Sequence, residues 1–325
     1  MRKAQDKLAD FCRVIARNRS IRYLKVDWGC DVDISILSPF IENNNHLRGL
    51  DLSNVCVECP CDEYPCDCPH NEREKDKLQD MALALSRRHN KNSLRSICLQ
   101  DNTSFSGCTD ELASELVRSL NGYHNLNKLN LNNNQIGKCG CTALGVLLKH
   151  PSCKLKEVYL HRCGIDNECV TILANSLVGN SCLTKLVLKE NDIGLAGWKA
   201  FSPILCDTSS IETTYNSNHT LEDFGKSYIS SRLVLPEEVA SLMRWNESQC
   251  KFMVVRRKII EHHFMSTEDN FDIFLDMELQ VLPYVISWMG RDTSMLLYQL
   301  FQKIPTLFEA NTKVGSSTMK RKRGS

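Results

Sequence analysis

The sequence predicts an α/β solenoid, in which successive strand–helix units stack on one another, followed by a small α-helical module. Two observations lead to this prediction. One short apolar pattern recurs five times along the chain, and the residues between its copies can form an amphipathic helix each. The spacing of the copies is close to the length of one strand plus one helix, which is typical of repeats that bury their apolar faces against their neighbours.

The recurring pattern contains three aliphatic residues at spacings of three and two, usually followed three residues later by Asn or Cys. Alternate residues of a short strand point to the same face, so these aliphatics are expected to face inward. The Asn or Cys can bond backbone groups that stay unpaired where the chain bends. The copies are Leu47-Leu50-Leu52, Leu94-Ile97-Leu99-Asn102, Leu126-Leu129-Leu131-Asn134, Leu155-Val158-Leu160-Cys163 and Leu183-Leu186-Leu188-Asn191.

The period leaves room for a helix in every unit. The central aliphatics Ile97, Leu129, Val158 and Leu186 are separated by 32, 29 and 28 residues. Aliphatic residues recur every three or four positions between them, which favours helices. A degenerate further copy is expected another 27 residues on, around Thr213 and Tyr215. The expected helices lie within residues 110–120, 144–148 and 170–178.

The segments LNKLNLNNNQIG and LTKLVLKENDIG resemble the strand segments of ribonuclease-inhibitor-type leucine-rich repeat proteins. The resemblance covers about residues 21–220 and implies a horseshoe, with a parallel sheet on the concave face and helices on the convex face. One repeat of ~28 residues buries too little apolar surface to offset the ordering of its own backbone. The repeats are therefore expected to share one continuous core and to need caps at both ends.

The ends of the chain are expected to differ from the repeats. Leu8, Phe11, Val14 and Ile15 indicate an N-terminal capping helix, and Ile21, Leu24 and Val26 a first strand. Pro236 followed by acidic residues is typical of a helix start, and helical patterns continue over 250–264 and 270–308. The expected domains are a capping helix at 1–20, repeats at 21–221, a helical module at 222–310 and a disordered basic tail at 311–325.

The C-terminal third carries a second resemblance. The segments TSSIETTYNSNHTL and DMELQVLPYVISWMGRD are similar to C-terminal extensions of leucine-rich repeat proteins from diatoms and related algae. This resemblance implies no known activity.

The composition excludes a strong electrostatic preference for any class of partner. The 325 residues carry a formal net charge of +1, so nucleic acid and membrane are not expected partners. No secretory signal or membrane-spanning apolar run is seen, and we expect a cytoplasmic or nuclear protein that is not secreted. The run Lys320-Arg321-Lys322-Arg323 is either a nuclear import signal or a solubilising end.

A Cys-rich insertion at about residues 55–79 lengthens one repeat, because Leu50 and Ile97 are 47 residues apart. Thiolates and an imidazole can close a tetrahedral zinc site, but only one pair here has the usual C-x2-C spacing. Three prolines favour a flexible loop instead. We expect no resident cofactor, and keep zinc as an alternative whose ligands would come from Cys56, Cys59, Cys61, Cys66, Cys68 and His70.

Most other cysteines are expected to be reduced, because nothing indicates an oxidising compartment. Cys163 takes the Asn position of its repeat, and Cys12, Cys169 and Cys206 fall on apolar helix faces, where a thiol acts as a small hydrophobe.

The concave face is the expected binding surface. Its side chains are mixed in charge, and the exposed Trp, Tyr, His and Arg are residue types that anchor protein interfaces. The residues expected to contact a partner are Trp28, Asp51, Gln100, Asn130, Asn132, Tyr159, His161, Arg162 and Lys189.

The sequence therefore predicts a non-catalytic scaffold that binds a partner protein. No Gly-rich phosphate loop, G-x-S-x-G elbow or H-E-x-x-H helix is present, and the run Glu261-His262-His263 is expected to be a solvated helix end.

Two other classes stay open. Ran GTPase-activating proteins resemble this repeat subtype, and that resemblance implies a strand-end Arg with nearby Asn residues. Their loose counterparts here are Arg95 or Arg162, with Asn130, Asn132 or Asn133. A substrate-recognition subunit of a ubiquitin ligase is the second alternative, although no F-box-like segment is seen before Ile21.

Overall fold

The chain forms two compact units. The repeat unit comprises 1–205 and 218–249, and the C-terminal unit comprises 206–217 and 250–325. The domain boundaries expected from the sequence remain predictions. The residues that the computed structural model describes are 10–16, 18–26, 36–54, 69–103, 109–225, 235–264 and 284.

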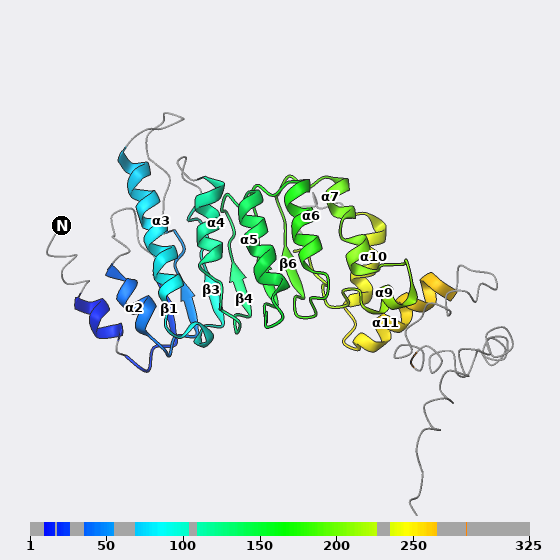
Figure 1. Cartoon of the computed structure of the whole chain (residues 1–325), viewed down its shortest axis with the longest axis horizontal. Helices are drawn as coiled ribbons and strands as arrows, with labels where there is room; N and C mark the ends of the chain where they lie inside the picture. Colours follow the sequence, from blue (N-terminus) through cyan, green and yellow to red (C-terminus); the bar gives the residue numbers. More distant parts are fainter. Residues whose placement is uncertain are drawn as a thin grey trace, which may run out of the picture. The chain divides into compact units, whose positions relative to one another are not determined.

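The repeat unit contains a six-stranded parallel sheet whose strand order follows the sequence (Figure 1). The central residues pair in register, Leu50 with Ile97, Ile97 with Leu129, and so on to Leu186. These are the central aliphatics of the sequence pattern, so the predicted strands of a parallel sheet are confirmed. The strands are β1 (Tyr23–Lys25), β2 (Gly49–Asp51), β3 (Ser96–Cys98), β4 (Lys128–Asn130), β5 (Glu157–Tyr159) and β6 (Lys185–Val187).

Helices cover one face of this sheet (Figure 1). The central strand residues from Leu50 to Leu186 point toward them and are at most 2% exposed. Together they form the continuous core that a stack of repeats requires. The helical elements of the repeat unit named here are α2 (Ser38–Asn43), α3 (Pro69–Arg87), η2 (Lys91–Ser93), α4 (Asp110–Arg118), α5 (Lys138–Lys149), α6 (Asn167–Ser176), α7 (Leu195–Lys199), α8 (Ser202–Leu205) and α10 (Glu237–Asn246).

A ladder of buried side-chain amides holds the bends that follow the strands. Asn134 Nδ2 donates to Leu131 O at 2.7 Å and to Leu99 O of the preceding repeat at 3.0 Å. Its Oδ1 accepts from the backbone N–H of Asn102 at 2.9 Å. In the next repeat the Cys163 thiol donates to Leu131 O at 3.2 Å. The predicted role of the Asn or Cys position is confirmed.

The residue just before the ladder position adopts a left-handed backbone in five repeats. Asn and Asp tolerate this conformation, whereas Arg and Glu occupy it at a cost of roughly 1–2 kcal/mol. The neighbouring ladder bonds over-determine the bend and keep it in place. The five residues, with φ of 51° to 57°, are Asn54, Asp101, Asn133, Arg162 and Glu190.

The start of α5 is capped by a side chain of the preceding repeat. The carboxylate of Asp110, in α4, accepts from the backbone N–H groups of Cys139 and Gly140 at 2.7 and 3.1 Å. Glycine is the N-cap residue of α5 and brings no side chain of its own. The cap therefore bonds the free N–H groups at the start of α5 and is also a contact between repeats.

A second set of asparagines, three residues before the first aliphatic, holds the bends that lead into strands. Asn180 Oδ1 accepts from the backbone N–H of Leu183 at 2.9 Å, and its Nδ2 donates to Leu148 O at 2.9 Å. Asn218 repeats the arrangement, donating to Asn180 O at 2.8 Å and accepting from Leu221 N at 2.9 Å.

The prediction of a degenerate strand around Thr213 and Tyr215 is wrong. Both residues lie in α9 (Ile211–Tyr215), which begins with a capping box at Ser210. The position next to β6 is taken instead by Asp223, whose O accepts from Leu186 N at 2.8 Å. The short helices α7 and α8 and the segment that contains α9 add residues that a constant period does not anticipate.

An aromatic cluster completes the apolar core near the last repeat. The ring of Phe224 lies 5.2 Å from Trp198 and 4.6 Å from Phe201, measured between centroids. The helix α10 packs against α8 in the same unit. Its start after Pro236 confirms the helix that the sequence predicts there.

The predicted N-terminal helix is present at 10–16, but its buried face differs from the prediction. Cys12 and Ile15 are buried, whereas Phe11 and Val14 are 58% and 72% exposed. Leu8 lies outside the described residues.

The long helix α3 begins at Pro69, a residue expected to interrupt regular structure. Proline suits the first turn of a helix, because the N–H it lacks would be unbonded there. Residues 69–79 of the expected insertion are therefore helical, and 55–68 lie outside the described residues.

In the C-terminal unit, α11 (Lys251–Ile259) packs against α9 and continues into η3 (Ile260–Phe264). His263 is 6% exposed, and its Nε2 lies 2.8 Å from Thr214 Oγ1. The expectation that this histidine is solvated is wrong. The helical pattern predicted at 270–308 lies outside the described residues, except for Tyr284.

The cysteines assigned to the interior are confirmed as buried. Cys163 is 1% exposed, and Cys12, Cys169 and Cys206 are at most 6% exposed. All four are free thiols.

Candidate functional site

The open face is the side of the sheet away from the helices, and it corresponds to the predicted concave face. The outer residues of each strand and the turns that follow supply its side chains. Trp28 lies outside the described residues. Arg162 is exposed, and the other predicted contact residues are partly exposed, namely Asp51, Gln100, Asn130, Asn132, Tyr159, His161 and Lys189.

A chain of hydrogen bonds crosses the open face from β2 to β4. Ser53 Oγ donates to Asp51 Oδ1 at 2.5 Å and lies 3.1 Å from Cys98 Sγ. Asn130 Nδ2 reaches both Cys98 Sγ and Gln100 Oε1 at 3.2 Å. Burial raises the pKa of the Cys98 thiol, so this sulfur stays protonated at neutral pH. These side chains are bonded mainly to one another, which makes this part of the face a fixed platform.

Tyr159 lies at the centre of a charged cluster on β4 to β6. Its OH donates to Glu157 Oε2 at 2.8 Å, and the Nζ atoms of Lys128 and Lys185 lie 4.8 and 5.8 Å from its ring centroid. Each lysine also has an acidic partner, Glu157 at 3.4 Å and Asp223 at 2.9 Å. Cation–π and hydrogen-bond contacts therefore hold the Tyr159 ring from several sides.

The same contacts favour the charged forms. The hydrogen bond from Tyr159 holds the pKa of Glu157 below its usual range, with help from Lys128. The hydrogen bond to Asp223 raises the pKa of Lys185. Burial lowers the pKa of Lys128, but Tyr159 and Glu157 outweigh it and the net shift is upward. The cluster is thus ionised and balanced at neutral pH.

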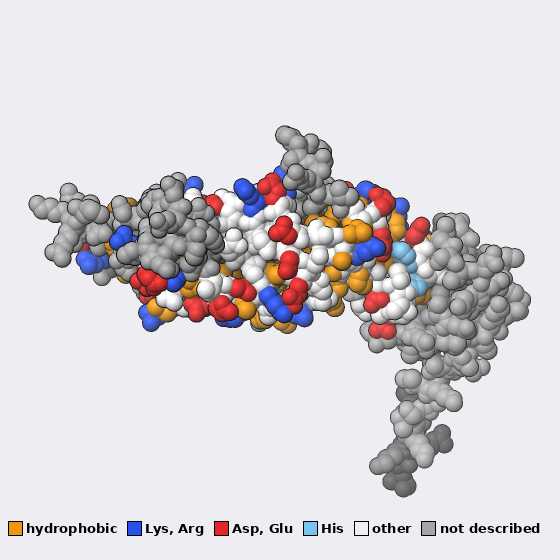
Figure 2. Space-filling view, turned by 90° about the horizontal axis from the view of Figure 1, so that it is seen from above, with side chains coloured by type: hydrophobic (Ala, Val, Ile, Leu, Met, Phe, Trp, Pro, Cys, Tyr) orange, Lys and Arg blue, Asp and Glu red, His pale blue; other side chains and the backbone are white. Residues whose placement is uncertain are grey.

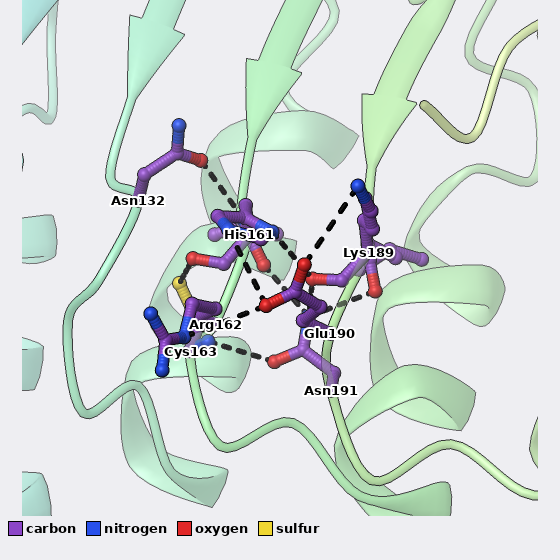
Figure 3. Close-up of polar contacts among 9 residues, drawn as sticks. Asn132, His161, Arg162, Cys163, Lys189, Glu190 and Asn191 are labelled. Atoms are coloured by element: carbon purple, nitrogen blue, oxygen red, sulfur yellow. Dashed lines mark hydrogen bonds and ion pairs between the residues drawn. The ribbon is translucent and has the colours of Figure 1, made fainter. Parts of the chain in front are cut away.

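Beyond the strand ends, four residues form what we call the turn cluster: His161, Arg162, Lys189 and Glu190 (Figure 3). The Glu190 carboxylate lies between the other three, at 3.6 Å from Arg162 Nε, 3.7 Å from Lys189 Nζ and 3.9 Å from His161 Nε2. His161 Nδ1 is 3.1 Å from Lys189 O. Because a carbonyl oxygen only accepts, Nδ1 carries the proton in that contact.

Asn132 connects the turn cluster to the hydrogen-bond chain. Its Oδ1 accepts from His161 N at 2.8 Å, and its own N–H donates to Asn130 Oδ1 at 3.0 Å. The structure therefore joins the predicted residues from Asp51 to Lys189 into one surface, apart from Trp28.

Sequence reasoning missed the row of charges one residue before the central aliphatics. Lys128, Glu157 and Lys185 occupy this row on neighbouring strands and surround Tyr159. The signal was available, because each directly precedes a central aliphatic of the pattern, and a strand places residues on both sides of an inward position on the same face.

Among the described residues, no group of three or more His, Cys, Asp or Glu is placed to hold a metal ion. The predicted zinc ligands from Cys56 to Cys68 lie outside these residues, and only the backbone of His70 is described, within α3. Zinc at the insertion therefore remains a prediction.

The two arginines considered for the GTPase-activating alternative, Arg95 and Arg162, lie at opposite ends of their strands. Arg95 precedes β3, and its Nη1 donates to Asn125 O at 3.3 Å. Arg162 follows β5, and the backbone O of its neighbour His161 accepts from Asn133 N at 2.8 Å. Only Arg162 shares a turn region with the asparagines.

The surface seen from above the strand ends is mixed in charge. Figure 2 shows acidic and basic side chains interspersed over the middle of this view, with hydrophobic side chains gathered to one side. Within the part of the chain that the structure describes, no helix combines the length and the apolarity needed to cross a membrane.

Comparisons with known proteins bear on the repeats. The family described as "Leucine Rich repeat" matches residues 124–145 and 179–202. The chain is 34% identical over 106 residues to human NACHT, LRR and PYD domains-containing protein 3, which covers 33% of this chain and 10% of the relative. It is 26% identical over 211 residues to human NACHT, LRR and PYD domains-containing protein 14, covering 63% of this chain and 17% of the relative.

A third relative, mouse NACHT, LRR and PYD domains-containing protein 5, is 32% identical over 130 residues, or 39% of this chain and 11% of the relative. The matches thus span less than a fifth of each relative's length. With the sheet register, they support the presence of leucine-rich repeats in the chain. The ribonuclease-inhibitor subtype and the algal C-terminal resemblance remain predictions.

Proposed function

We propose that the protein is a non-catalytic scaffold that binds a partner protein on the open face of its repeats. The observation that supports this most is the state of Tyr159, which is partly exposed yet held by Glu157, Lys128 and Lys185. Tyrosine and arginine are enriched among residues that dominate interface energies. Here Tyr159 at the end of β5 and the exposed Arg162 in the turn that follows it lie on one surface.

The fixed geometry of the face also favours binding. A side chain that is already ordered loses less conformational entropy when a partner covers it. The hydrogen-bond chain from Asp51 to His161 fixes several polar side chains before any partner arrives. A partner therefore meets a surface that needs little rearrangement.

Catalysis has less support on this face. The partly exposed thiol of Cys98 has a raised pKa, which disfavours the nucleophilic thiolate. The charged groups around Tyr159 are paired with one another, and their pKa shifts favour the charged forms. A general acid or base would need a pKa shifted toward neutrality.

The test is a cross-linked pull-down from the native source with the double variant Tyr159→Ala/Arg162→Ala. We expect at least one protein that the wild type recovers to fall by tenfold or more, because losing about 2 kcal/mol at an interface anchor lowers affinity roughly thirtyfold. The control is Lys149→Ala/Asn175→Ala, which changes exposed residues of α5 and α6. Equal recovery by all three proteins, with matching circular dichroism, would contradict the proposal.

The same experiment separates the alternatives. A GTPase-activating role requires recovery of Ran, and faster GTP hydrolysis that depends on Arg162. A ubiquitin-ligase role requires co-purification of ligase subunits. A cytoplasmic or nuclear location is part of the proposal, and the basic run at 320–323 remains a predicted import signal.

A further inference from the structure

The turn cluster differs from the rest of the open face in its charge balance. Around Tyr159, each lysine has its own carboxylate, Lys128 with Glu157 and Lys185 with Asp223. In the turn cluster, Arg162 and Lys189 share the single carboxylate of Glu190, and His161 also faces it. Positive charge is therefore in excess in the turn cluster, in contrast to the described residues around Tyr159.

The ion pairs of the turn cluster are also long. Glu190 lies 3.6 to 3.9 Å from its three partners, whereas Lys185 and Asp223 are 2.9 Å apart and Lys138 and Glu168 are 2.6 Å apart. Charge-assisted hydrogen bonds between such groups are normally about 2.7–2.9 Å long. Glu190 thus screens three groups without forming a tight bond to any of them.

The guanidinium group of Arg162 is available to bind a carboxylate. Its side chain is 66% exposed, and its only ion pair in the described residues uses Nε. The two terminal nitrogens form no hydrogen bond there, and a guanidinium fork suits a carboxylate in a bidentate arrangement. The backbone that carries it is fixed, because Arg162 N donates to Lys189 O at 3.1 Å and Cys163 N to Asn191 Oδ1 at 2.8 Å.

We propose that the turn cluster recognises carboxylate side chains of an acidic peptide segment in the partner. This inference rests on the proposed function and names the chemistry of the partner at one end of the binding face. The carboxylate of the partner binds between Arg162 and Lys189, which lie on either side of Glu190 in Figure 3. Glu190 competes with the incoming carboxylate and limits binding of weakly acidic segments.

This arrangement predicts opposite effects for neighbouring substitutions. Arg162→Gln and Lys189→Gln each remove an attractive charge, and affinity for an acidic segment falls by about three- to fivefold, as expected for partly exposed ion pairs. Glu190→Gln removes the competing charge, and affinity rises by a similar factor. A purely structural role for Glu190 would give the reverse sign.

The experiment measures fluorescence anisotropy of a fluorescein-labelled hexaglutamate peptide with the full chain. The variants are Arg162→Gln, Lys189→Gln and Glu190→Gln, with Lys149→Gln, an exposed lysine of α5, as the matched control. We expect binding that weakens as salt rises from about 50 to about 300 mM, because exposed charges are then screened. Lys149→Gln should bind like the wild type.

Three results of the peptide-binding measurement would overturn the proposal. These are no saturable binding of hexaglutamate by the wild type, weaker binding by Glu190→Gln, or equal losses in Lys149→Gln and Arg162→Gln. Displacement by inorganic phosphate at the same concentration as peptide carboxylates would also overturn it, because the site would then be a simple anion site. If hexaglutamate fails while the Tyr159→Ala/Arg162→Ala pull-down still loses a partner, only the acidic preference is wrong.

Discussion

At the bend between β4 and α5, the side chain of Asn134 satisfies backbone groups from two repeats. It accepts from the N–H groups of Asn102 and Thr103 at 2.9 Å and donates to Leu99 O and Leu131 O. These backbone groups are buried and cannot bond water, so they depend on the Asn134 side chain as their partner. Removing it would leave these groups unpaired inside the protein.

We therefore predict that Asn134→Ala lowers the free energy of unfolding by about 2–4 kcal/mol, since one or two buried polar groups lose their partners. Urea unfolding followed by circular dichroism measures the change. Gln135→Ala, at the exposed neighbouring position, is the control and should change it by less than about 0.5 kcal/mol. Similar values for the two variants would show that the ladder contributes little.

A second residue-scale prediction concerns Lys258, which is fully buried in the C-terminal unit. Burial lowers its pKa to about 7, against about 10.4 in an unfolded chain. Between these values the unfolded state binds more protons, so stability rises with pH, by at most about 1.4 kcal/mol per pH unit for one proton.

Thermal unfolding of the wild type and of Lys258→Met at several pH values above about 7 tests this. The melting temperature of the wild type should rise relative to that of the variant as pH increases. If the melting temperatures of the two proteins change with pH in parallel, Lys258 does not cause the pH dependence of stability.

Single residues of the site were predictable to different degrees. Tyr159, Arg162 and Lys189 follow from the strand pattern alone, because their distance from the central aliphatic sets their face. The grouping of Glu190 with Arg162, Lys189 and His161 was not predictable, because it depends on a left-handed backbone at Arg162 and Glu190. Neither residue type favours that conformation by itself.

At the scale of elements, the repeat period predicted the strands of the parallel sheet, because the central aliphatics recur at the length of one strand plus one helix. The misplaced strand at Thr213 shows the limit of a period. Along the chain, the helices α7 and α8 and then residues 206–217 of the C-terminal unit separate β6 from the strand-like segment at Asp223. The asparagine three residues before Leu183 and Leu221 is the local signal that could have located it.

The shared core gives an element-scale prediction. Leu129, in the middle of the sheet, is 0% exposed, whereas Leu24 in the edge strand β1 is partly exposed. Leu129→Ala should lower the free energy of unfolding by about 2–5 kcal/mol, and Leu24→Ala by clearly less, because less apolar surface and a smaller cavity are involved. Urea unfolding of both variants measures this, and equal losses would contradict a core shared between repeats.

At the scale of the whole molecule, the sequence predicted one solenoid followed by a helical module, and the chain divides into two units with segments that alternate. Residues 206–217 belong to the C-terminal unit, whereas residues 218–249 belong to the repeat unit. The repeat period cannot reveal this division, because the division depends on contacts between segments that are distant in the sequence. The repeat unit carries the open face, so the proposed binding belongs to this unit.

The most direct test of binding on the open face uses the first partner that the wild type recovers. Its dissociation constant is measured by calorimetry with the wild type, with Tyr159→Ala/Arg162→Ala and with Lys149→Ala/Asn175→Ala. We predict that the open-face variant binds at least about tenfold more weakly and that the helix-face variant binds like the wild type. Unchanged affinity in the open-face variant, together with a loss in the helix-face variant, would contradict the account.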